Sequence, residues 1–342
     1  MLKEKKQSAL ISGYAAMKAH ARLEPFQYEL KGLGPWDVSI EVSHCGICHS
    51  DIHLIDDDWG FSVFPLVPGH EIVGTVAGLG ENVTHLKKGD RVGVGWQAGS
   101  CMNCEWCEQG EEHLCSESRA VCVGNYGGFG PIVTADARFA FPIPDSISSE
   151  AAAPLLCGGI TVYSPLKRHE VGPSMKVGVI GIGGLGHLAL QFADALGGEV
   201  FAFSSTEGKE QDAKKFGADH FILSQDSKQM GKLKQSLDFI LSAVNVDLNW
   251  MQFMNLLRPK GKLCIVGASP GDIKTTPFSL IVGERSICGS VIGNRRTIRE
   301  MLEFASRHKI ASKSEIVPIS DVNQALERVR HNQARYRMVL KH

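Results

Sequence analysis

The chain has 342 residues, of which 43% are hydrophobic and 21% charged, and its formal net charge is −1. This length predicts two domains, and the near-neutral charge argues against nucleic-acid or membrane-surface binding driven by bulk electrostatics. The first twenty residues lack the long apolar core of a secretory signal, and no apolar run is long enough to span a bilayer. We therefore expect a cytoplasmic globular protein.

Short apolar runs, separated by glycine and proline, fill residues 1–150. The runs Asp37–Val42, Ile72–Val76 and Asp90–Val94 are predicted strands. Closely spaced strands with glycine and proline between them are typical of a small, partly open β-barrel with irregular loops.

Cysteine and histidine residues occur in two short motifs of this first part, and a further cysteine follows just after it. The motifs are Gly46–His53 (GICHSDIH) and Gly69–Glu71 (GHE), and Leu155–Gly158 (LLCG) follows later. A catalytic zinc site uses a few protein ligands and keeps one position open, and thiolates with an imidazole suit it. Any one of these residues alone is more often structural, so the combination carries the prediction.

Four further cysteines are spaced x2, x2 and x7 within one loop: Cys101, Cys104, Cys107 and Cys115. Thiolates at such short range let a loop fold around one tetrahedral ion. Four thiolates leave no open position, so we predict a structural zinc site. Disulfides and an iron–sulfur cluster are the alternatives, although most cysteines of a cytoplasmic protein stay reduced.

From residue 151 to residue 292 strands alternate with helices. A helix is expected to start at Ser148–Glu150, where a capping serine precedes an acid. Strands are predicted at 175–180, 200–203, 220–223, 237–241 and 262–266, and helices at 185–196 and 210–216. This alternation predicts a doubly wound parallel sheet.

The glycine-rich segment Gly181–Gly186 (GIGGLG) joins the first of these strands to its helix. Gly181 allows a tight turn, Gly183 lets the backbone approach a pyrophosphate, and Gly186 allows helix and strand to pack. The helix N-terminus adds N–H groups and a positive dipole end. In this strand–loop–helix context the segment predicts dinucleotide binding.

The end of the second strand indicates which dinucleotide binds. An NAD enzyme usually has an acid there, whereas this chain has Ser204 and Ser205, followed by Lys209. Hydroxyl groups and a lysine suit a 2′-phosphate, so we predict NADP(H). Glu207 would repel that phosphate if its side chain turned inward, and Lys209 could instead be a solvated residue at a helix start.

Residues 293–342 contain predicted helices at 297–307 and 322–331 and a last strand at 336–340. This segment is too small to stand alone. We expect it to complete the domain formed by residues 1–150.

Together these motifs resemble one family. The pattern G-H-E-x2-G-x5-G-x2-V over residues 69–83 is similar to the signature of zinc-containing medium-chain dehydrogenases/reductases. Residues 45–51 (CGICHSD) and 153–166 (APLLCGGITVYSPL) resemble its cinnamyl alcohol dehydrogenase branch, and the resemblance runs from Gly13 to Arg337. It implies a GroES-like β-barrel catalytic domain (1–150, completed by 293–342) and a Rossmann domain (151–292).

The resemblance also implies roles for single residues. Cys48, His70 and Cys157 would bind the catalytic zinc, and Glu71 could approach the metal when ligands exchange. Asp51 would orient His70, or it could simply cap a loop. The cofactor contacts implied are His49, Thr161, Gly181, Gly183, Gly184, Leu185, Gly186, Ser204, Ser205, Lys209, Gly267, Ser290, Val291 and Ile292.

The implied reaction is reduction of an aldehyde by NADPH, with zinc polarising the carbonyl group. The proton would pass from Ser50 through the ribose hydroxyls to His53, unless His53 is only a surface loop residue. Trp59 and Trp96 would line an apolar pocket for an aromatic or medium-chain aldehyde, although both could instead be core residues.

Two other functions fit the same fold. Polyol dehydrogenases of this fold typically replace the third zinc ligand by glutamate, but here that residue is Cys157. Non-enzymatic NADPH-binding relatives tend to lose zinc ligands, and none is missing here. The resemblance further implies a homodimer formed through edge strands near Ile287–Ile292.

Overall fold

The computed structural model describes residues 10–30 and 32–342. The basic residues 1–9, considered above for a signal sequence, lie outside the described residues. The chain forms two compact units. Unit 1 takes in the described residues up to Cys157, together with Asn294–Leu302 and Ala311–His342, and unit 2 takes in Gly158–Gly293 and Glu303–Ile310.

Unit 1 is mainly β-structure. Its strands and helices are β1 (Leu10–Ala15), β2 (Glu24–Glu29), β3 (Asp37–Ile47), α1 (His49–Asp56), β4 (Glu71–Leu79), β5 (Arg91–Val94), β6 (Gln97–Gly99), α2 (Glu105–Glu108), β7 (Arg119–Ala120), β8 (Ile132–Asp136), β9 (Phe141–Pro142), α3 (Ser149–Pro154), β16 (Ser314–Pro318), α11 (Val322–Arg330) and β17 (Arg337–Lys341). The main sheet has the order β16-β17-β3-β4-β5-β9, and β8 also pairs with β3.

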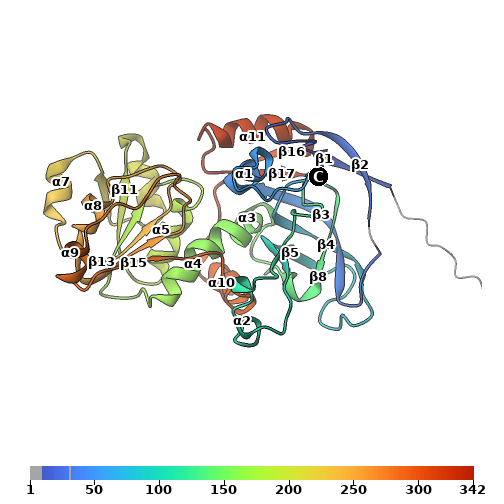
Figure 1. Cartoon of the computed structure of the whole chain (residues 1–342), viewed down its shortest axis with the longest axis horizontal. Helices are drawn as coiled ribbons and strands as arrows, with labels where there is room; N and C mark the ends of the chain where they lie inside the picture. The colour runs from blue at the N-terminus through green and yellow to red at the C-terminus, as the bar shows by residue number, and fades with distance from the viewer. Residues whose placement is uncertain (1–9, 31) are drawn as a thin grey trace, which may run out of the picture. The chain divides into compact units, whose positions relative to one another are not determined.

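Strand β3 pairs with β17, β4 and β8 and is therefore central to this sheet. Its side chains alternate between the core and the outer face. Val38, Ile40 and Val42 are buried, whereas Glu41 between them is exposed. The last strand, β17, pairs antiparallel with the end of β3, so residues from both ends of the chain share one sheet. Helices α1 and α11 lie side by side over this region (Figure 1), joined by the ion pair between Asp56 and Arg330.

Unit 2 is a layered α/β structure. Its elements are α4 (Ile160–Arg168), β10 (Lys176–Ile180), α5 (Gly186–Ala195), β11 (Glu199–Ser204), α6 (Glu210–Lys215), β12 (His220–Leu223), α7 (Ser227–Lys232), β13 (Leu237–Ser242), α8 (Trp250–Met254), β14 (Leu257–Ile265), α9 (Pro277–Ile281) and β15 (Ser286–Gly289). All six strands are parallel, in the order β12-β11-β10-β13-β14-β15. This is the doubly wound order, in which the strand sequence reverses between β10 and β13. The predicted fold class is therefore confirmed.

Two segments contribute residues to both units. One is α10 (Arg295–His308), and the other is a π-helical turn, Leu155–Gly159, between α3 and α4. Pro154 has no backbone N–H to continue a regular helical ladder, and the π-turn begins directly after it. This turn carries Cys157.

One strand begins earlier than the sequence predicts. The strand expected from residue 262 already starts at Leu257, because Pro259 and Gly261 resemble a turn but lie within the strand. Lys260 between them has φ 65°, and the pairing with β13 shifts register in this region. The strand therefore continues through a local irregularity at which the sequence predicts its boundary.

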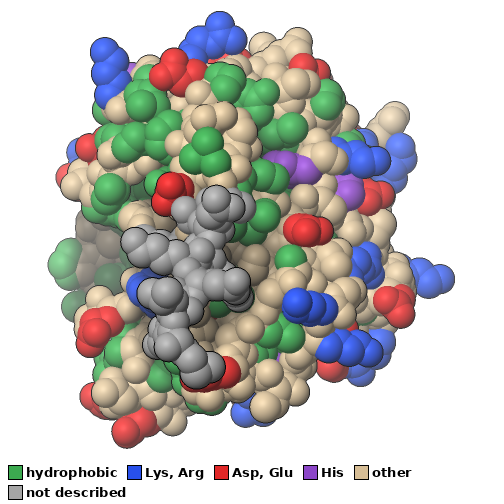
Figure 2. All heavy atoms as spheres, turned by 90° about the vertical axis from the view of Figure 1, so that its right-hand side faces the viewer, with side chains coloured by type: hydrophobic (Ala, Val, Ile, Leu, Met, Phe, Trp, Pro, Cys, Tyr) green, Lys and Arg blue, Asp and Glu red, His purple; other side chains and the backbone are tan. Residues whose placement is uncertain are grey.

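Acidic and basic side chains are interspersed with apolar and neutral ones on the face shown in Figure 2. This mixture agrees with the net charge of −1. Among the described residues, no helix combines the length and the apolar character needed to cross a membrane.

Candidate functional site

Asp51 organises the first group of predicted ligands. Its fully buried carboxylate accepts hydrogen bonds from the backbone N–H of Cys48 (2.9 Å) and of Gly69 (2.9 Å), and it lies 2.9 Å from His70 Nδ1. Asp51 is in the first turn of α1, so the bond to Cys48 also caps that helix. Orienting His70 and capping α1 are thus two effects of one carboxylate, because it has two oxygens and several lone pairs.

The predicted catalytic ligands meet in one buried cluster. The ligand atoms of Cys48, His70, Glu71 and Cys157 all lie within 4.8 Å of one another. Cys48 is placed between β3 and α1, His70 directly precedes β4, and Cys157 is on the π-turn. A buried group of two thiols, an imidazole and a carboxyl, far apart in sequence, is a donor set that favours zinc.

The thiolate character of Cys48 and the geometry of the cluster suit a metal. The hydrogen bond from the Cys157 thiol lowers the pKa of Cys48 well below its usual value and raises that of Cys157. Because Asp51 can only accept, His70 donates its Nδ1 proton to that carboxylate, and Nε2 faces Cys157 Sγ at 3.3 Å. A tetrahedral zinc with ordinary bond lengths would place such an N and S pair about 3.6 Å apart. The residues present therefore fit a zinc ion.

Sequence reasoning missed the role of Arg337. This buried guanidinium is paired with Glu71, and the two residues are 266 positions apart in the chain. Burial raises the pKa of Glu71 to about 7, although Arg337 opposes that rise. The other carboxylate oxygen of Glu71 has no partner in the described structure, which leaves it available to a metal. No local motif signals Arg337, because only the pairing of β17 with β3 brings it here.

Aromatic side chains border this cluster. The Trp96 ring lies 5.1 Å from that of His70 in an edge-on arrangement, and the Trp59 ring lies 6.0 Å from Trp96. Trp59 is 38% exposed, so it is no core residue. The two predicted pocket residues therefore adjoin one another and the metal cluster.

Ser50 and His53 are three residues apart on α1 and so project from adjacent positions of the same helix face. Both are half-buried, and His53 Nδ1 lies 2.7 Å from the more exposed Asp58. The His53 ring also lies 5.1 Å from the Trp59 ring. His53 is thus a helix residue next to the aromatic wall and not part of a surface loop.

The four-cysteine loop forms the second cluster. The sulfur atoms of Cys101, Cys104, Cys107 and Cys115 lie within 4.8 Å of one another. Cys101 Sγ is 3.5 Å from Cys115 Sγ and 3.9 Å from Cys107 Sγ, whereas thiolates on a tetrahedral zinc would lie about 3.8 Å apart. All four are free thiols, at separations close to those that one shared tetrahedral ion requires.

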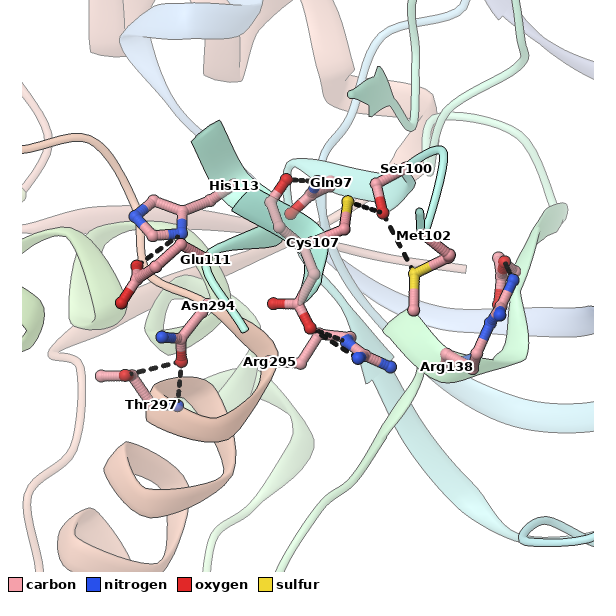
Figure 3. Close-up of polar contacts among 12 residues, drawn as sticks. Gln97, Ser100, Met102, Cys107, Glu111, His113, Arg138, Asn294, Arg295 and Thr297 are labelled. Atoms are coloured by element: carbon pink, nitrogen blue, oxygen red, sulfur yellow. Dashed lines mark hydrogen bonds and ion pairs between the residues drawn. The ribbon is translucent and has the colours of Figure 1, made fainter. Parts of the chain in front are cut away.

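Hydrogen bonds fix this loop to the rest of unit 1 (Figure 3). Cys107 Sγ lies 3.4 Å from Ser100 Oγ, and Gln97 donates to the carbonyl of Glu112 at 2.8 Å. The buried Glu112 carboxylate is also held by Arg295 of α10, at 2.6 Å from Nε and 2.5 Å from a terminal nitrogen. The loop is thereby tied to a helix far away in the sequence.

The glycine-rich loop of unit 2 has the form that dinucleotide binding requires. Gly181 has φ 88°, which disfavours any residue with a side chain, and its N–H bonds the carbonyl of Phe203. A Cβ on Gly186 would meet the Gly181 carbonyl oxygen at 1.7 Å, so the tight packing is within the loop more than against the strand. A Cβ on Gly183 would meet no atom within 4 Å, which leaves open space in front of the N-terminus of α5.

The predicted 2′-phosphate residues lie beside this loop. Ser204 ends β11 and its hydroxyl bonds the Thr206 carbonyl at 2.9 Å. Lys209 Nζ donates to the carbonyl of Ile182 in the glycine-rich loop at 2.9 Å, so Lys209 is not simply solvated. Ser205 and Glu207 are both exposed. The Lys209 ammonium group thus contacts the glycine-rich loop, whereas the Glu207 side chain is exposed.

The remaining predicted cofactor residues of unit 2 follow the carboxyl ends of its strands. Gly267 comes just after β14, and Ser290, Val291 and Ile292 come just after β15. In parallel sheets these ends share one edge, which is where ligands bind. Thr161 is buried on α4, whereas His49 belongs to unit 1 at the start of α1. Their contacts to a cofactor stay predictions.

Comparison with known proteins identifies the family. Residues 34–145 match the alcohol dehydrogenase GroES-like domain, and residues 184–307 match the zinc-binding dehydrogenase domain. An aldehyde reductase, AdhA, of Synechocystis is 43% identical over 333 residues, which cover 97% of this chain and 99% of that protein. The chain is a zinc-containing alcohol dehydrogenase of the medium-chain dehydrogenase/reductase family.

This alcohol dehydrogenase falls in the cinnamyl alcohol dehydrogenase-like branch. The crystal structure of CAD from Helicobacter pylori complexed with NADP(H) has a TM-score of 0.90 and 33% identity, covering 98% of this chain and 99% of that one. A probable mannitol dehydrogenase of Fragaria ananassa is 42% identical, over 96% of this chain and 94% of that protein. The enzyme thus has a catalytic and a structural zinc site, and its substrates are small alcohols and aldehydes.

Proposed function

We propose that this alcohol dehydrogenase works with NADP(H) and mainly reduces aldehydes that carry an aromatic ring or a medium-length chain. The observation that carries the cofactor choice is Lys209, whose ammonium reaches the glycine-rich loop next to Ser204. A cation and hydroxyls at this place favour a 2′-phosphate, whereas NAD enzymes place a carboxylate here. The H. pylori relative that was solved with NADP(H) supports the same choice.

When bound, zinc would act as a Lewis acid toward the substrate oxygen and NADPH would supply the hydride. The side chains around the cluster prepare the site for that chemistry. Asp51 keeps the His70 proton on Nδ1, and Arg337 holds Glu71 at the rim of the cluster. Both contacts are buried, so they restrict these side chains to one arrangement.

The reduced substrate needs a proton, and α1 supplies a route for it. Ser50 holds a hydroxyl proton near the cluster, and His53 lies one helical turn further on. The Asp58 carboxylate accepts a hydrogen bond from His53 Nδ1 at 2.7 Å and so orients the ring. Proton transfer by a positioned side chain typically contributes about 10²–10⁴-fold to a rate.

The aromatic wall supports the proposed substrate class. Trp59 and Trp96 present flat apolar faces next to His70, and Phe61 stacks on Trp59 at 5.6 Å. Such rings favour flat or extended apolar molecules over polyols with a hydroxyl on every carbon, since those hydroxyls would lose hydrogen bonds to water.

The cofactor proposal is tested by comparing kcat/KM for NADPH and NADH with cinnamaldehyde as substrate. We expect a preference for NADPH, and Lys209→Met should reduce kcat/KM for NADPH by about 10–100-fold, the value of one hydrogen bond to a charged group. The rate with NADH should change little. Glu207→Gln, at an exposed neighbouring residue, is the matched control. It should leave kcat/KM for NADPH unchanged or raise it slightly.

The substrate proposal is tested in the same assay with a panel of aldehydes and with mannitol oxidation. Cinnamaldehyde and a medium-chain aldehyde should give the highest kcat/KM, and Trp96→Ala should lower both while leaving zinc content unchanged. A higher kcat/KM for mannitol than for any aldehyde would contradict the proposal and favour a polyol dehydrogenase. Faster use of NADH would instead contradict the role of Lys209.

A further inference from the structure

Unit 2 contains a cysteine pair that the reaction does not use. Cys264 on β14 and Cys288 on β15 are direct register partners in neighbouring parallel strands. His169, just after α4, joins them, and the three ligand atoms lie within 4.8 Å of one another. Cys264 is buried, and Cys288 and His169 are half-buried. None of the three belongs to either zinc cluster.

A basic side chain sets the orientation of the His169 proton. Lys262 Nζ lies 3.4 Å from His169 Nδ1, and because an ammonium only donates, Nδ1 must accept. The ring proton is then on Nε2, which lies 3.5 Å from Cys288 Sγ. Burial lowers the pKa of His169, and Lys262 lowers it further, so the ring stays neutral near pH 7. The imidazole therefore donates to the Cys288 sulfur.

The two sulfurs are electrostatically unequal. A hydrogen bond from Cys264 lowers the pKa of Cys288 to about 7, against its burial and with help from Lys262 and Arg168. The same bond and burial raise the pKa of Cys264 far above its usual value. Cys288 is also 3.8 Å from the carbonyl of Leu263, which can accept its proton when it is a thiol. Of the two sulfurs, Cys288 is thus the one whose surroundings favour the thiolate, and Cys264 lies beside it as a thiol.

We propose that Cys288 and Cys264 form a reversible disulfide when the enzyme meets a hydroperoxide. The Cys288 thiolate attacks one oxygen of the peroxide, breaks the O–O bond and becomes a sulfenic acid, while the other oxygen leaves as hydroxide or alkoxide and takes a proton. The Cys264 sulfur then attacks the Cys288 sulfur, and water leaves. Both thiols are oxidised by two electrons in total, the peroxide is reduced, and small thiols restore the pair.

The sheet geometry permits this bond. Neighbouring strands lie about 4.8 Å apart, and disulfides form at Cα separations of about 4.4–6.8 Å. Register partners in a parallel sheet also project from the same face. This agrees with the finding that both sulfurs and a nitrogen of His169 lie within 4.8 Å of one another. The strands need no rearrangement to bring the sulfurs together.

A third metal site is the competing assignment for these ligands, and Lys262 argues against it. A histidine that binds a metal through Nε2 normally donates its Nδ1 proton to an acceptor. Here Nδ1 faces an ammonium, which cannot accept. The other charged groups around His169 are Arg168 and three residues that line a cavity of about 150 Å³ with it, namely Asp238, Arg258 and Lys260. The surroundings are thus mainly cationic and stabilise a thiolate more than a dication.

The test is peptide mapping of the zinc-loaded enzyme under non-reducing conditions after treatment with one equivalent of hydrogen peroxide. We expect a cross-linked peptide that joins Cys264 to Cys288 and disappears on reduction with dithiothreitol. Cys264→Ser should instead leave a sulfenic acid at Cys288, which dimedone traps. Cys122→Ala is the matched control, because it removes a buried cysteine outside the pair and should leave the cross-link unchanged.

The rate of Cys288 alkylation by iodoacetamide tests the same proposal on the unaltered protein. Its pH midpoint should lie near 7, and Lys262→Met or His169→Phe should slow alkylation at pH 7 about ten-fold. A midpoint at 8.5 or above, or a cross-link between Cys288 residues of two chains, would overturn the proposal. A third zinc per chain that is lost in Cys288→Ser would overturn it in favour of a metal site.

Discussion

At the scale of single residues, Asp51 links helix formation to metal binding. Its carboxylate accepts from two backbone N–H groups and faces His70, all without exposure to solvent. A buried acceptor with three donors has no spare position for a donor of its own. Replacing one oxygen by an amide nitrogen would therefore set two donors against each other.

Asp51→Asn should weaken the catalytic zinc site about 10–100-fold, which is typical for loss of a residue that orients a metal ligand. The measurement is zinc release to a chromophoric chelator as a function of its concentration. Asp58→Asn is the control, because Asp58 contacts His53 and no metal ligand. Equal zinc affinity in Asp51→Asn and the unaltered enzyme would show that Asp51 only caps α1.

At the scale of elements, α10 holds the structural zinc loop through one buried ion pair. Glu112 is 3% exposed and Arg295 22% exposed, and one Glu112 oxygen has no partner in the described structure. Arg295 also packs over the Phe139 ring at 5.5 Å. Breaking such a pair is costly because the remaining charge is left buried and unpaired.

Arg295→Met should destabilise unit 1 by about 2–4 kcal/mol, since it leaves the Glu112 carboxylate buried without its cation. Urea unfolding followed together with zinc release measures the effect. The double variant Arg295→Met/Glu112→Gln should recover part of the loss, because no buried charge remains. If both variants lost the same stability, packing on Phe139 and not charge burial would be the cause.

At the scale of the whole molecule, the chain combines two zinc sites, of which one has four thiolate ligands and the other keeps a coordination position open. The four-thiolate cluster is complete, whereas the buried cluster around His70 has two thiols and one imidazole, with the Glu71 carboxyl group held beside them by Arg337. A closed site exchanges its metal less readily than one with an open position. The two ions should therefore be separable.

The purified enzyme should contain two zinc ions per chain by elemental analysis. Mild chelation should remove the ion of the His70 cluster first, abolishing activity with little change in unfolding midpoint. Cys48→Ala and Cys101→Ser should each retain one ion, but only Cys101→Ser should lose substantial stability. A single ion in the unaltered enzyme would contradict the two-site assignment.

The predicted homodimer stays a prediction at this scale. β15 is the last strand of the six-stranded sheet, and α9 nearby in sequence exposes Phe278 (74%) and Ile281 (71%). An unpaired strand edge and exposed apolar side chains favour association with a second copy. A solution mass of one chain would exclude it.

Much of the molecule could be predicted from the sequence because the determining signals are short. Cys101 and Cys115 are only 14 positions apart, so their spacing alone brings the thiolates together. The glycine-rich loop depends on one turn in which the φ of 88° at Gly181 favours glycine, and the parallel sheet follows from alternating strands and helices.

Other features were decided only by tertiary structure. Glu71 meets Arg337 and Glu112 meets Arg295 across 266 and 183 positions, which no local spacing encodes. Likewise, only the register of β14 with β15 places Cys264 beside Cys288. The physical reason is that strand pairing and burial, and not sequence separation, decide which charges and sulfurs become neighbours. The sequence by itself therefore determined the fold class and the metal and cofactor motifs, whereas the folded chain decided the buried partners that tune them.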